Sequence, residues 1–329
     1  MIHPVIDLHC DLLAHMLEMP DPFAQKGIGC SFPALAEGNV KLQVMAIFTA
    51  TEKGSSLLAL KQSEIFASFL TKYPDYCTLV HDNNTLNQTT ISSKLGMVAA
   101  IENASGFCEE DETFEKGIKK LEQIIANTKR ILYIGLTHHA ENRFGGGNNS
   151  NVGLKADGEK LLQYLNGKKI AIDFSHTSDA LAYDILEYIS KNNLDLHILA
   201  SHSNYRKVFD HARNLSNDLA KEIIKRKGLI GVNFLRAFVH PDNSNVIYDH
   251  INHGINLGGK QSICFGADYY ATGNHPDRSR MPFYFKEHSD ASRYPSILQS
   301  IGSLISAESV DEISYKNAYT FIKRLWGKK

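Results

Sequence analysis

The sequence is poor in cysteine and has no long apolar run. Its five cysteines are scattered along 329 residues, form no CxxC pair and are odd in number. They therefore predict reduced thiols in a cytoplasm rather than a disulfide framework. No apolar run approaches the roughly 18 residues of a membrane span, and the opening residues lack the segments of a secretory signal. We expect a cytoplasmic protein with no membrane partner.

An excess of charge of either sign is also missing. Lys and Arg number 35 against 36 Asp and Glu, the net charge is −1, and no basic run stands out. These counts argue against a nucleic-acid partner. With 43% hydrophobic and 22% charged residues, the composition is that of an ordinary globular protein. We expect residues 1–329 to form one domain, because α/β barrels often reach this length as one unit.

Strand-like and helix-like segments alternate along the chain. Eight apolar segments predict strands at 5–9, 42–50, 96–102, 131–138, 169–176, 196–202, 228–234 and 262–268. Amphipathic stretches predict helices at 56–73, 113–127, 157–166, 178–192, 216–227, 295–306 and 308–325. Eight buried strands that alternate with helices favour an α/β fold, a closed (β/α)8 TIM barrel. A doubly wound open sheet is the alternative, but its glycine-rich phosphate turn does not follow the first strand.

Histidine is abundant, with 15 in the chain, and several stand where predicted strands end. Histidines or acidic residues end six of the eight predicted strands: His9, Asp11, Glu102, His138, His139, His176, His202 and Asp268. The carboxyl ends of the strands in a parallel barrel lie on one face, where active sites form. We therefore expect these side chains to meet in one pocket.

The first predicted strand opens the stretch VIDLHCDLL (residues 5–13), in which polar and apolar residues alternate. Alternation predicts an inner and an outer face of the strand. The expected inner residues are Asp7, His9 and Asp11, and the expected outer ones are Ile6, Leu8 and Cys10. Asp7 either orients a metal ligand or is a buried hydrogen-bonding carboxylate.

Two expectations concern the segment after the fourth predicted strand. Strand alternation permits only one of His138 and His139 to point inward. The three consecutive glycines of NRFGGGNNS (142–150) predict a flexible loop over the pocket, because the GK[ST] of a phosphate loop does not follow them.

The donor set indicates metal-dependent hydrolysis. Nitrogen and oxygen ligands without thiolates suit zinc or another borderline divalent metal such as manganese. Two histidines, one aspartate and one glutamate, together with His9, give five ligands. Five ligands exceed the usual three of a mononuclear catalytic site, so two ions that share a carboxylate fit better. Such pairs generate hydroxide at neutral pH, and a nearby carboxylate can carry the proton.

At these residues the sequence resembles the renal (membrane) dipeptidase family, the zinc-dependent M19 peptidases of the amidohydrolase superfamily. The matching segments, in the family's order over residues 5–271, are VIDLHCDLL, AAIENA, LTHHAEN, IDFSHTS, SHSNYRKVFDHARNLSND, GLIGVNFL and GADYYA. Two departures stand out. The family's usual LTHN reads LTHHAEN here, and asparagine and alanine follow Glu102 where the family often has glycines.

The resemblance implies two zinc ions per chain and assigns protein ligands to each ion. His9 and Asp11 would bind one ion. His176 and His202 would bind the other. Glu102 would bridge the two.

The resemblance also implies the catalytic groups. Asp268 would hold the bridging water and pass its proton to the leaving amine. His138 would bind the substrate by polarising the scissile carbonyl and would stabilise the oxyanion. Arg213 would bind the carboxylate at the C-terminal end of the substrate, a task suited to its planar fork.

The family resemblance implies a homodimer that hydrolyses small dipeptides, among them those with a C-terminal D-residue. An N-acyl-amino-acid deacylase is the alternative, because its substrate also presents a free carboxylate to Arg213. The sequence identifies no acidic partner for a free substrate amine. A third hypothesis is a barrel that binds without catalysis. It would require the loss of Asp268 or of a metal ligand, and none is lost.

Overall fold

Eight parallel strands frame the computed structural model, which describes residues 3–24, 27–273 and 277–327. The barrel strands are β1 (Val5–Cys10), β2 (Val40–Ile47), β4 (Leu95–Ile101), β5 (Ile131–Gly135), β6 (Ala171–Asp173), β7 (Ile198–Leu199), β8 (Ile230–Val232) and β9 (Ile263–Phe265). They pair in the order β7-β6-β5-β4-β2-β1-β9-β8. A parallel bridge between Ala200 and Ile230 joins β7 to β8 and closes the ring. The predicted (β/α)8 TIM barrel and its eight strands are confirmed.

The sequence did not predict the remaining strand, β3 (Cys77–Leu79). This strand pairs in parallel with the amino-terminal half of β4, from Leu95 to Met97, and stands outside the ring. Two of its three residues are only partly buried, so the segment lacks the apolar run that marks the barrel strands in the sequence.

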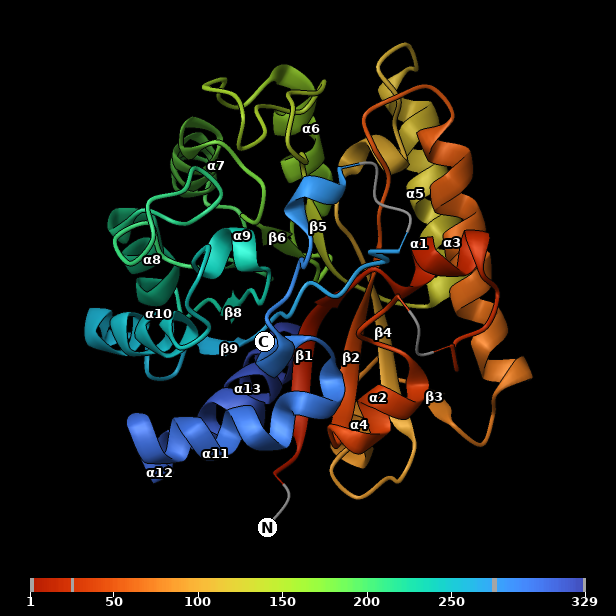
Figure 1. Cartoon of the computed structure of the whole chain (residues 1–329). Coiled ribbons are helices and arrows are strands. Elements are labelled where there is room, and N and C mark those ends of the chain that lie inside the picture. Colours follow the sequence, from red (N-terminus) through yellow and green to blue (C-terminus); the bar gives the residue numbers. More distant parts are fainter. Residues whose placement is uncertain (1–2, 25–26, 274–276, 328–329) are drawn as a thin grey trace.

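Helices surround the strands (Figure 1). They are α1 (Leu12–Glu18), α2 (Phe32–Glu37), α3 (Ser55–Lys72), α4 (Asn83–Gln88), α5 (Phe114–Thr128), α6 (Ala156–Leu165), α7 (Asp179–Lys191), α8 (Asn217–Lys225), α9 (Arg236–Val239), α10 (Val246–Gly254), α11 (Tyr294–Leu304), α12 (Ala307–Asp311) and α13 (Asn317–Trp326). All the predicted helices are present. The predicted last helix is divided by a π-helical turn at Glu312–Lys316, which separates α12 from α13.

Hydroxyl side chains fix the starts of three outer helices. Thr113, Ser178 and Ser216 precede α5, α7 and α8, and each side chain accepts a hydrogen bond from the backbone N–H three residues further on. Such a cap contributes about 1 kcal/mol to helix stability. Ser178 lies two residues after His176, so the start of α7 also fixes the end of the loop that carries this histidine.

Side chains of alternate strand residues fill the barrel interior. Residues from seven strands form one buried cluster with the last helix: Ile6, Leu8, Leu42, Val44, Val98, Ala100, Leu132, Tyr133, Ala171, Leu199, Cys264, Phe321, Ile322 and Leu325. The neighbours Met97, Ala99 and Ile101 of β4 belong instead to the outer cluster with the helices. Alternation along β4 continues to Glu102, which therefore points inward above Ala100.

The predicted faces of β1 are wrong for Ile6, Asp7 and Leu8, whereas Cys10 packs in the outer cluster and His9 points inward, as predicted. Ile6 and Leu8 pack in the interior cluster, whereas the carboxylate of Asp7 faces α11 and accepts a hydrogen bond from the Tyr294 hydroxyl (2.5 Å). The register between β1 and β2 shifts after Asp7. This irregularity breaks the alternation and allows His9 to enter the interior.

Asp7 ties three elements together. It is fully buried, and its Oδ1 accepts the backbone N–H groups of His9 (3.0 Å) and Ala267 (3.1 Å). Burial raises the pKa of its carboxyl. Of the two roles left open, the contacts match the buried hydrogen-bonding carboxylate, because Asp7 holds the backbone of His9 and not its imidazole.

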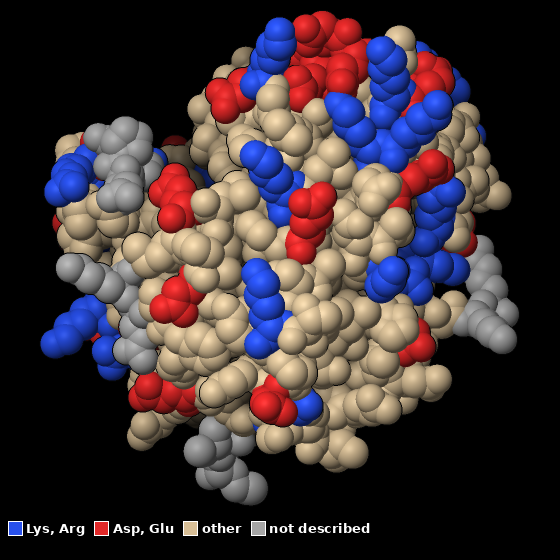
Figure 2. Space-filling view, turned by 90° about the vertical axis from the view of Figure 1, so that its right-hand side faces the viewer, with Lys and Arg blue, Asp and Glu red and all other residues tan. Residues whose placement is uncertain are grey.

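One face of the surface carries both charge signs. Figure 2 shows Lys and Arg side chains among Asp and Glu on the face at the right-hand side of Figure 1, where α3 and α5 lie. This mixture agrees with the balanced charge of the sequence. Within the described ranges, no helix is long and apolar enough to cross a bilayer.

Replacing Asp7 tests its role in the fold. Asp7→Ala should lower the free energy of unfolding by about 3 kcal/mol, because two backbone N–H groups and the Tyr294 hydroxyl lose a buried acceptor. Tyr294→Phe removes one of these donors and should cost about 1 kcal/mol. Urea denaturation of both variants measures the two values. A loss for Asp7→Ala no larger than that for Tyr294→Phe would contradict the assignment.

Candidate active site

A pocket of about 790 Å³ opens where the strands end. This volume is typical of small-molecule sites. Its wall includes Asp11, Phe48, Glu102, His138, His139, His176, Phe238 and Asp268. His9 and His202 are fully buried beneath it. The side chains at the ends of six strands therefore meet at one place.

One group of donors surrounds His9. Its Nε2 lies 3.5 Å from Oε2 of Glu102 and 3.7 Å from Oδ1 of both Asp11 and Asp268. Among the described residues, His9 Nε2, Asp11 Oδ1 and Glu102 Oε2 are buried without a hydrogen-bond partner. Buried polar atoms left without partners are costly, so this group fits a cation placed between them.

A second group lies on the other side of Glu102. Nε2 of His176 and Nε2 of His202 are 3.0 Å apart, and Oε1 of Glu102 lies 3.1 and 3.5 Å from them. Donors that share one tetrahedral zinc ion are about 3.3–3.5 Å apart. The two oxygens of Glu102 thus face two donor groups, which adjoin where the rings of His9 and His202 stack at 3.7 Å, and each group fits a divalent ion.

Burial gives these groups unusual protonation. It raises the pKa of Glu102 to about 8 and that of Asp268 to about 7. Burial, together with the charge of Glu102, raises the pKa of Asp11 well above its usual range. The pKa values of His176 and His202 are lowered well below normal, also chiefly by burial. Neutral imidazoles beside crowded carboxylates are suited to a metal ion, whose charge offsets the repulsion.

Hydrogen bonds beneath the pocket fix the ring orientation of His202. The Ser201 hydroxyl donates to Asp173 Oδ2 (2.5 Å) and lies 2.7 Å from Nδ1 of His202. Since the hydroxyl proton is given to Asp173, Ser201 accepts the Nδ1–H of His202, which leaves Nε2 as the metal-binding nitrogen.

His9 is held in the same way. The Tyr133 hydroxyl donates to the Leu8 carbonyl (2.9 Å) and lies 2.7 Å from Nδ1 of His9. Tyr133 therefore accepts the Nδ1–H, and Nε2 of His9 faces the carboxylates with a free lone pair. The sequence did not reveal these supports, because a tyrosine inside an apolar strand and a serine before a histidine are ordinary features.

The glycine-rich segment is not the flexible loop that the sequence predicted. Gly145, Gly146 and Gly147 are buried. A Cβ at Gly147 would lie 2.0 Å from the His138 carbonyl oxygen, and one at Gly146 would lie 2.1 Å from that of Val152. The glycines are required because backbone packs directly against backbone.

This packing delivers Asn148 to the pocket. Its Oδ1 lies 3.0 Å from Nδ1 of His139 and 3.2 Å from Nδ1 of His176. The amide oxygen can accept from both rings, so Asn148 orients His176 as Ser201 orients His202.

Both His138 and His139 line the pocket, so the expectation that only one points inward is wrong. Strand β5 ends at Gly135, three residues earlier than predicted, and strand alternation no longer applies at these histidines. His138 lies 3.6 Å from Glu102 Oε1 and packs against the ring of Phe48 at 4.9 Å. Burial lowers the pKa of His138 well below its usual value. His139 is exposed at the mouth.

Asp268 stands beside the donor groups in a strained conformation. Its φ is +64°, and that of His176 is +67°, a left-handed region that residues other than glycine seldom adopt. Oδ2 of Asp268 accepts a hydrogen bond from the Asn233 amide (2.7 Å). Oδ1, 3.7 Å from His9 Nε2, faces the donor groups.

Arg213 lies behind His202. Its guanidinium donates to the Ser203 hydroxyl (2.9 Å) and to the His202 carbonyl (2.8 Å). The residue is 4% exposed, and burial lowers the pKa of its side chain. Its Nε has no hydrogen-bond partner in the described part of the chain.

Further residues of the pocket wall were missed by sequence reasoning. They are Ala14, His15, Glu18, Met19, Gly27, Leu235, Tyr270, Ala271, Gly273 and Arg280. They lie in α1 and the segment that follows it, just before α9 and in the segments after β9, where no strand-end pattern marks them. Their place in the pocket depends on the tertiary fold.

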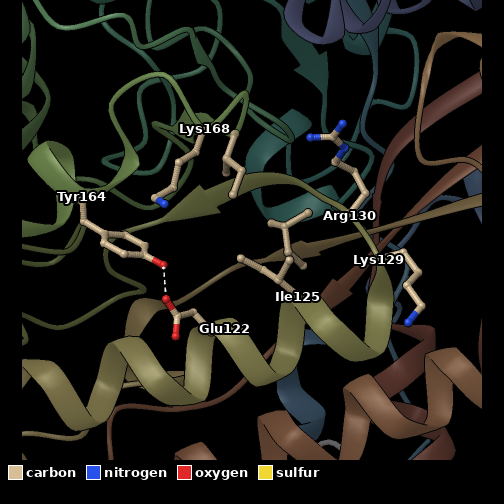
Figure 3. A pocket seen from close by; sticks show the side chains of 8 residues that line it. Glu122, Ile125, Lys129, Arg130, Tyr164 and Lys168 are labelled. Carbon is tan, nitrogen blue, oxygen red and sulfur yellow. Dashed lines mark hydrogen bonds between the residues drawn. The ribbon is translucent and has the colours of Figure 1, made fainter.

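A smaller pocket, of about 340 Å³, lies between α5 and α6 (Figure 3). Its polar groups engage one another. The Tyr164 hydroxyl donates to Glu122 (3.1 Å), and the Lys168 ammonium lies 4.2 Å from the centre of the Tyr164 ring. It is remote from the strand-end residues, and we assign it no part in the site.

The barrel and the histidine–carboxylate groups at its strand ends define an enzyme of the metallohydrolase class. The family model of membrane dipeptidases, peptidase family M19, matches residues 2–325. The chain therefore belongs to this family and is an enzyme of the metallo-dipeptidase type.

Curated relatives are distant. An uncharacterized protein in the pqqA 5' region of Klebsiella pneumoniae is 27% identical over 248 residues, which cover 70% of this chain and 83% of that protein. An uncharacterized dipeptidase of Schizosaccharomyces pombe is 27% identical over 206 residues, 60% of this chain and 46% of that protein.

Solved structures share the fold over the whole chain. The dipeptidase AC, a metallopeptidase of family M19, superposes with a TM-score of 0.85 at 18% identity and full coverage of both chains. A metallopeptidase from Rhodobacter sphaeroides, liganded with a phosphinate mimic of the dipeptide L-Ala-D-Ala, has a TM-score of 0.84 at 17% identity, with 99% of this chain and all of that chain covered. At these identities the likeness concerns the fold.

The support for His202 can be tested by removing one hydroxyl. Ser201→Ala should weaken metal affinity about 10–100-fold, because the ring loses the acceptor that fixes its tautomer. Competition with a chromophoric chelator measures this affinity. Ser303→Ala in α11 is the matched control, since its hydroxyl bonds only a backbone carbonyl of its own helix. Unchanged metal affinity in Ser201→Ala would refute the role of Ser201 in orienting His202.

Proposed function

We propose that the protein hydrolyses the amide bond of small dipeptides with two bound divalent ions, of which zinc is the best candidate. One observation carries this proposal: the two oxygens of Glu102 face two separate groups of buried donors. A carboxylate with a donor group on each side is suited to bridging a metal pair.

His9 and Asp11 would hold one ion and His176 and His202 the other, with Glu102 shared. All five side chains are buried, and Asp11, Glu102 and His176 also line the pocket wall, where water and substrate can reach a bound ion. When bound, such a pair of ions polarises the scissile carbonyl and makes a hydroxide available at neutral pH.

Asp268 is our candidate for proton transfer. Asn233 engages its Oδ2, so Oδ1 is the oxygen free to take a proton from the attacking water. The same oxygen can then give the proton to the leaving amine.

His138 and Arg213 are our candidates for substrate binding. A neutral His138 ring can donate an N–H to the substrate carbonyl and to the oxyanion that develops from it. Nε of Arg213 is buried and has no hydrogen-bond partner among the described residues, and its N–H is the donor that we assign to the terminal carboxylate. The Ser203 and His202 contacts hold the guanidinium in place meanwhile.

A dipeptide fits the pocket better than an N-acyl amino acid because of Glu18. Three of the four acidic residues of the wall, Asp11, Glu102 and Asp268, belong to the metal-binding groups. The fourth, Glu18 on α1, is exposed and makes no ion pair with another described residue. It can receive the free amine that only the dipeptide carries. The L-Ala-D-Ala mimic on the Rhodobacter sphaeroides metallopeptidase leads us to include C-terminal D-residues.

We also propose that the chain is one domain, that it forms a homodimer and that it acts in the cytoplasm. The first two follow from the family resemblance. The third rests on the cysteines, all five of which are buried free thiols.

The proton-transfer role can be separated from metal binding. Asp268→Asn should keep its metal content and lose about 10²–10⁴-fold in kcat, because the amide cannot accept the proton. Elemental analysis and dipeptide turnover measure the two effects. Asp242→Asn, an exposed residue outside the pocket wall, is the control. Near-normal turnover in Asp268→Asn would assign the proton to another group.

A substrate screen tests the function itself. The metal-loaded enzyme should hydrolyse L,L and L,D dipeptides faster than the corresponding N-acyl amino acids. Glu18→Gln should raise KM for free dipeptides about tenfold, the loss of roughly one charged contact, and leave KM for N-acyl substrates unchanged. Preferred turnover of N-acyl amino acids would favour the deacylase, and an equal change of KM for both classes would remove Glu18 from amine recognition.

A further inference from the structure

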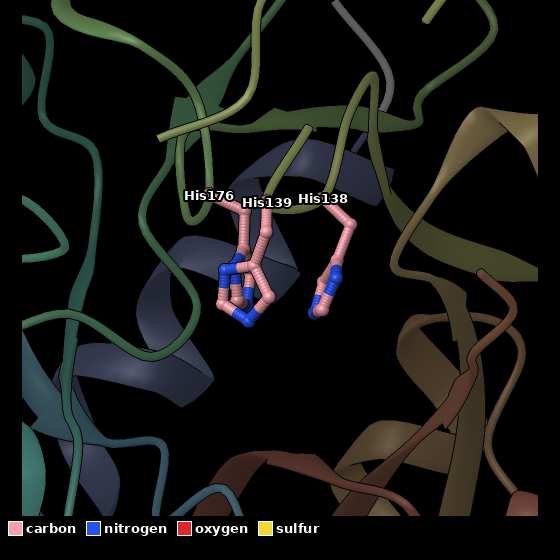
Figure 4. A group of neighbouring side chains, drawn as sticks. All are labelled: His138, His139 and His176. Carbon is pink, nitrogen blue, oxygen red and sulfur yellow. The ribbon is translucent and has the colours of Figure 1, made fainter. Parts of the chain in front are cut away.

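Three histidines form a second cluster above the donor groups. His138 and His139 follow β5, and His176 follows β6 (Figure 4). The ring centre of His138 lies 4.0 Å from that of His139 and 4.1 Å from that of His176. One nitrogen of each ring lies within 4.8 Å of the others. The cluster therefore offers three imidazoles to one point at the mouth.

The free nitrogen of His139 is set by Asn148. Its Nδ1 lies 3.0 Å from the Asn148 amide oxygen, while the Asn148 amide nitrogen donates to Asn149. The amide oxygen thus accepts the Nδ1–H of His139, which leaves Nε2 with its lone pair. Asn148 therefore holds the exposed His139 in the tautomer that can bind a metal ion through Nε2.

We propose that His138 and His139, at the edge of the cluster that they form with His176, make an accessory site for one further borderline divalent ion, and that an ion bound there blocks the pocket. The donors are neutral nitrogens, which suit Zn²⁺, Ni²⁺ or Cu²⁺ and not the harder Mg²⁺ or Ca²⁺. The site differs from the two ions of the proposed function, since neither His138 nor His139 is a ligand of those.

The accessory site is weaker than the inner positions. His176 turns its Nε2 toward Glu102 and His202, so in the loaded enzyme it is already engaged. The further ion then keeps two imidazoles and completes its coordination with water. Its occupancy removes His138 from the substrate carbonyl, so excess metal inhibits in competition with the dipeptide. This inhibition rests on the proposed function, whereas the binding does not.

Equilibrium dialysis of the zinc-loaded protein against rising Zn²⁺ tests the binding. We expect one ion per chain beyond the inner ones, lost in His139→Asn and weakened about tenfold in Asn148→Ala, which releases the ring. His81→Asn is the matched control, because its side chain is 43% exposed and stands before α4. Far-UV circular dichroism checks that each variant is folded. No additional ion in the parent protein, or an unchanged one in His139→Asn, overturns the site.

Kinetics with the same Zn²⁺ series tests the consequence. The dissociation constant from dialysis should equal the inhibition constant, and inhibition should be competitive with the dipeptide and absent in His139→Asn. Binding without inhibition would overturn the blocking of the pocket. If no dipeptide is hydrolysed at all, the proposed function fails while the dialysis still decides the accessory site.

Discussion

The buried carboxylate of Glu102 is the constraint on which the rest of the site depends. Its charge lies among histidines and other carboxylates in an environment that disfavours ionisation, as its raised pKa records. Strand β4 is well suited to carry it, because β4 pairs with β2, β5 and β3. A strand held by three neighbours gives the carboxylate a fixed position. Both donor groups are then built outward from its two oxygens.

Each of the three histidines proposed as metal ligands beside Glu102 has its second nitrogen engaged by a different partner. Tyr133 serves His9, Ser201 serves His202, and Asn148 serves His176. Three unrelated side chains thus perform one task, which is to present Nε2 with its lone pair. Because these supports hold each ring in its metal-binding orientation, little reorganisation is needed for binding.

Much of the fold and the gathering of site residues could be predicted from the sequence, and the failures have local causes. Buried parallel strands carry long apolar runs, so their number and order could be predicted, although seven of the eight end one to three residues earlier than predicted. The faces of β1 were not, because a register shift after Asp7 inverts the alternation. The histidines after β5 were misjudged because the strand ends at Gly135.

Other features are invisible to pattern reasoning. A run such as Gly145–Gly147 is the same in a flexible loop and in a backbone packed against backbone, and only the neighbouring carbonyls tell them apart. Likewise, Glu18 is an ordinary helix residue until the fold brings α1 to the pocket wall. The roles of the individual site residues remain proposals, since they depend on substrate and metal.

The short strand β7 gives the barrel a seam. Only two residues form it, and beyond them Ala200 exchanges hydrogen bonds with Leu229 and Gly231 to join β8. Because so few backbone hydrogen bonds join β7 to β8, local opening of the barrel should begin there. His202 stands on this seam, whereas Glu102 stands on the most firmly paired strand. An ion bound between Glu102 and His202 would link the least firmly paired part of the barrel wall to its most firmly paired strand. The same ion would then serve both catalysis and the stability of the barrel.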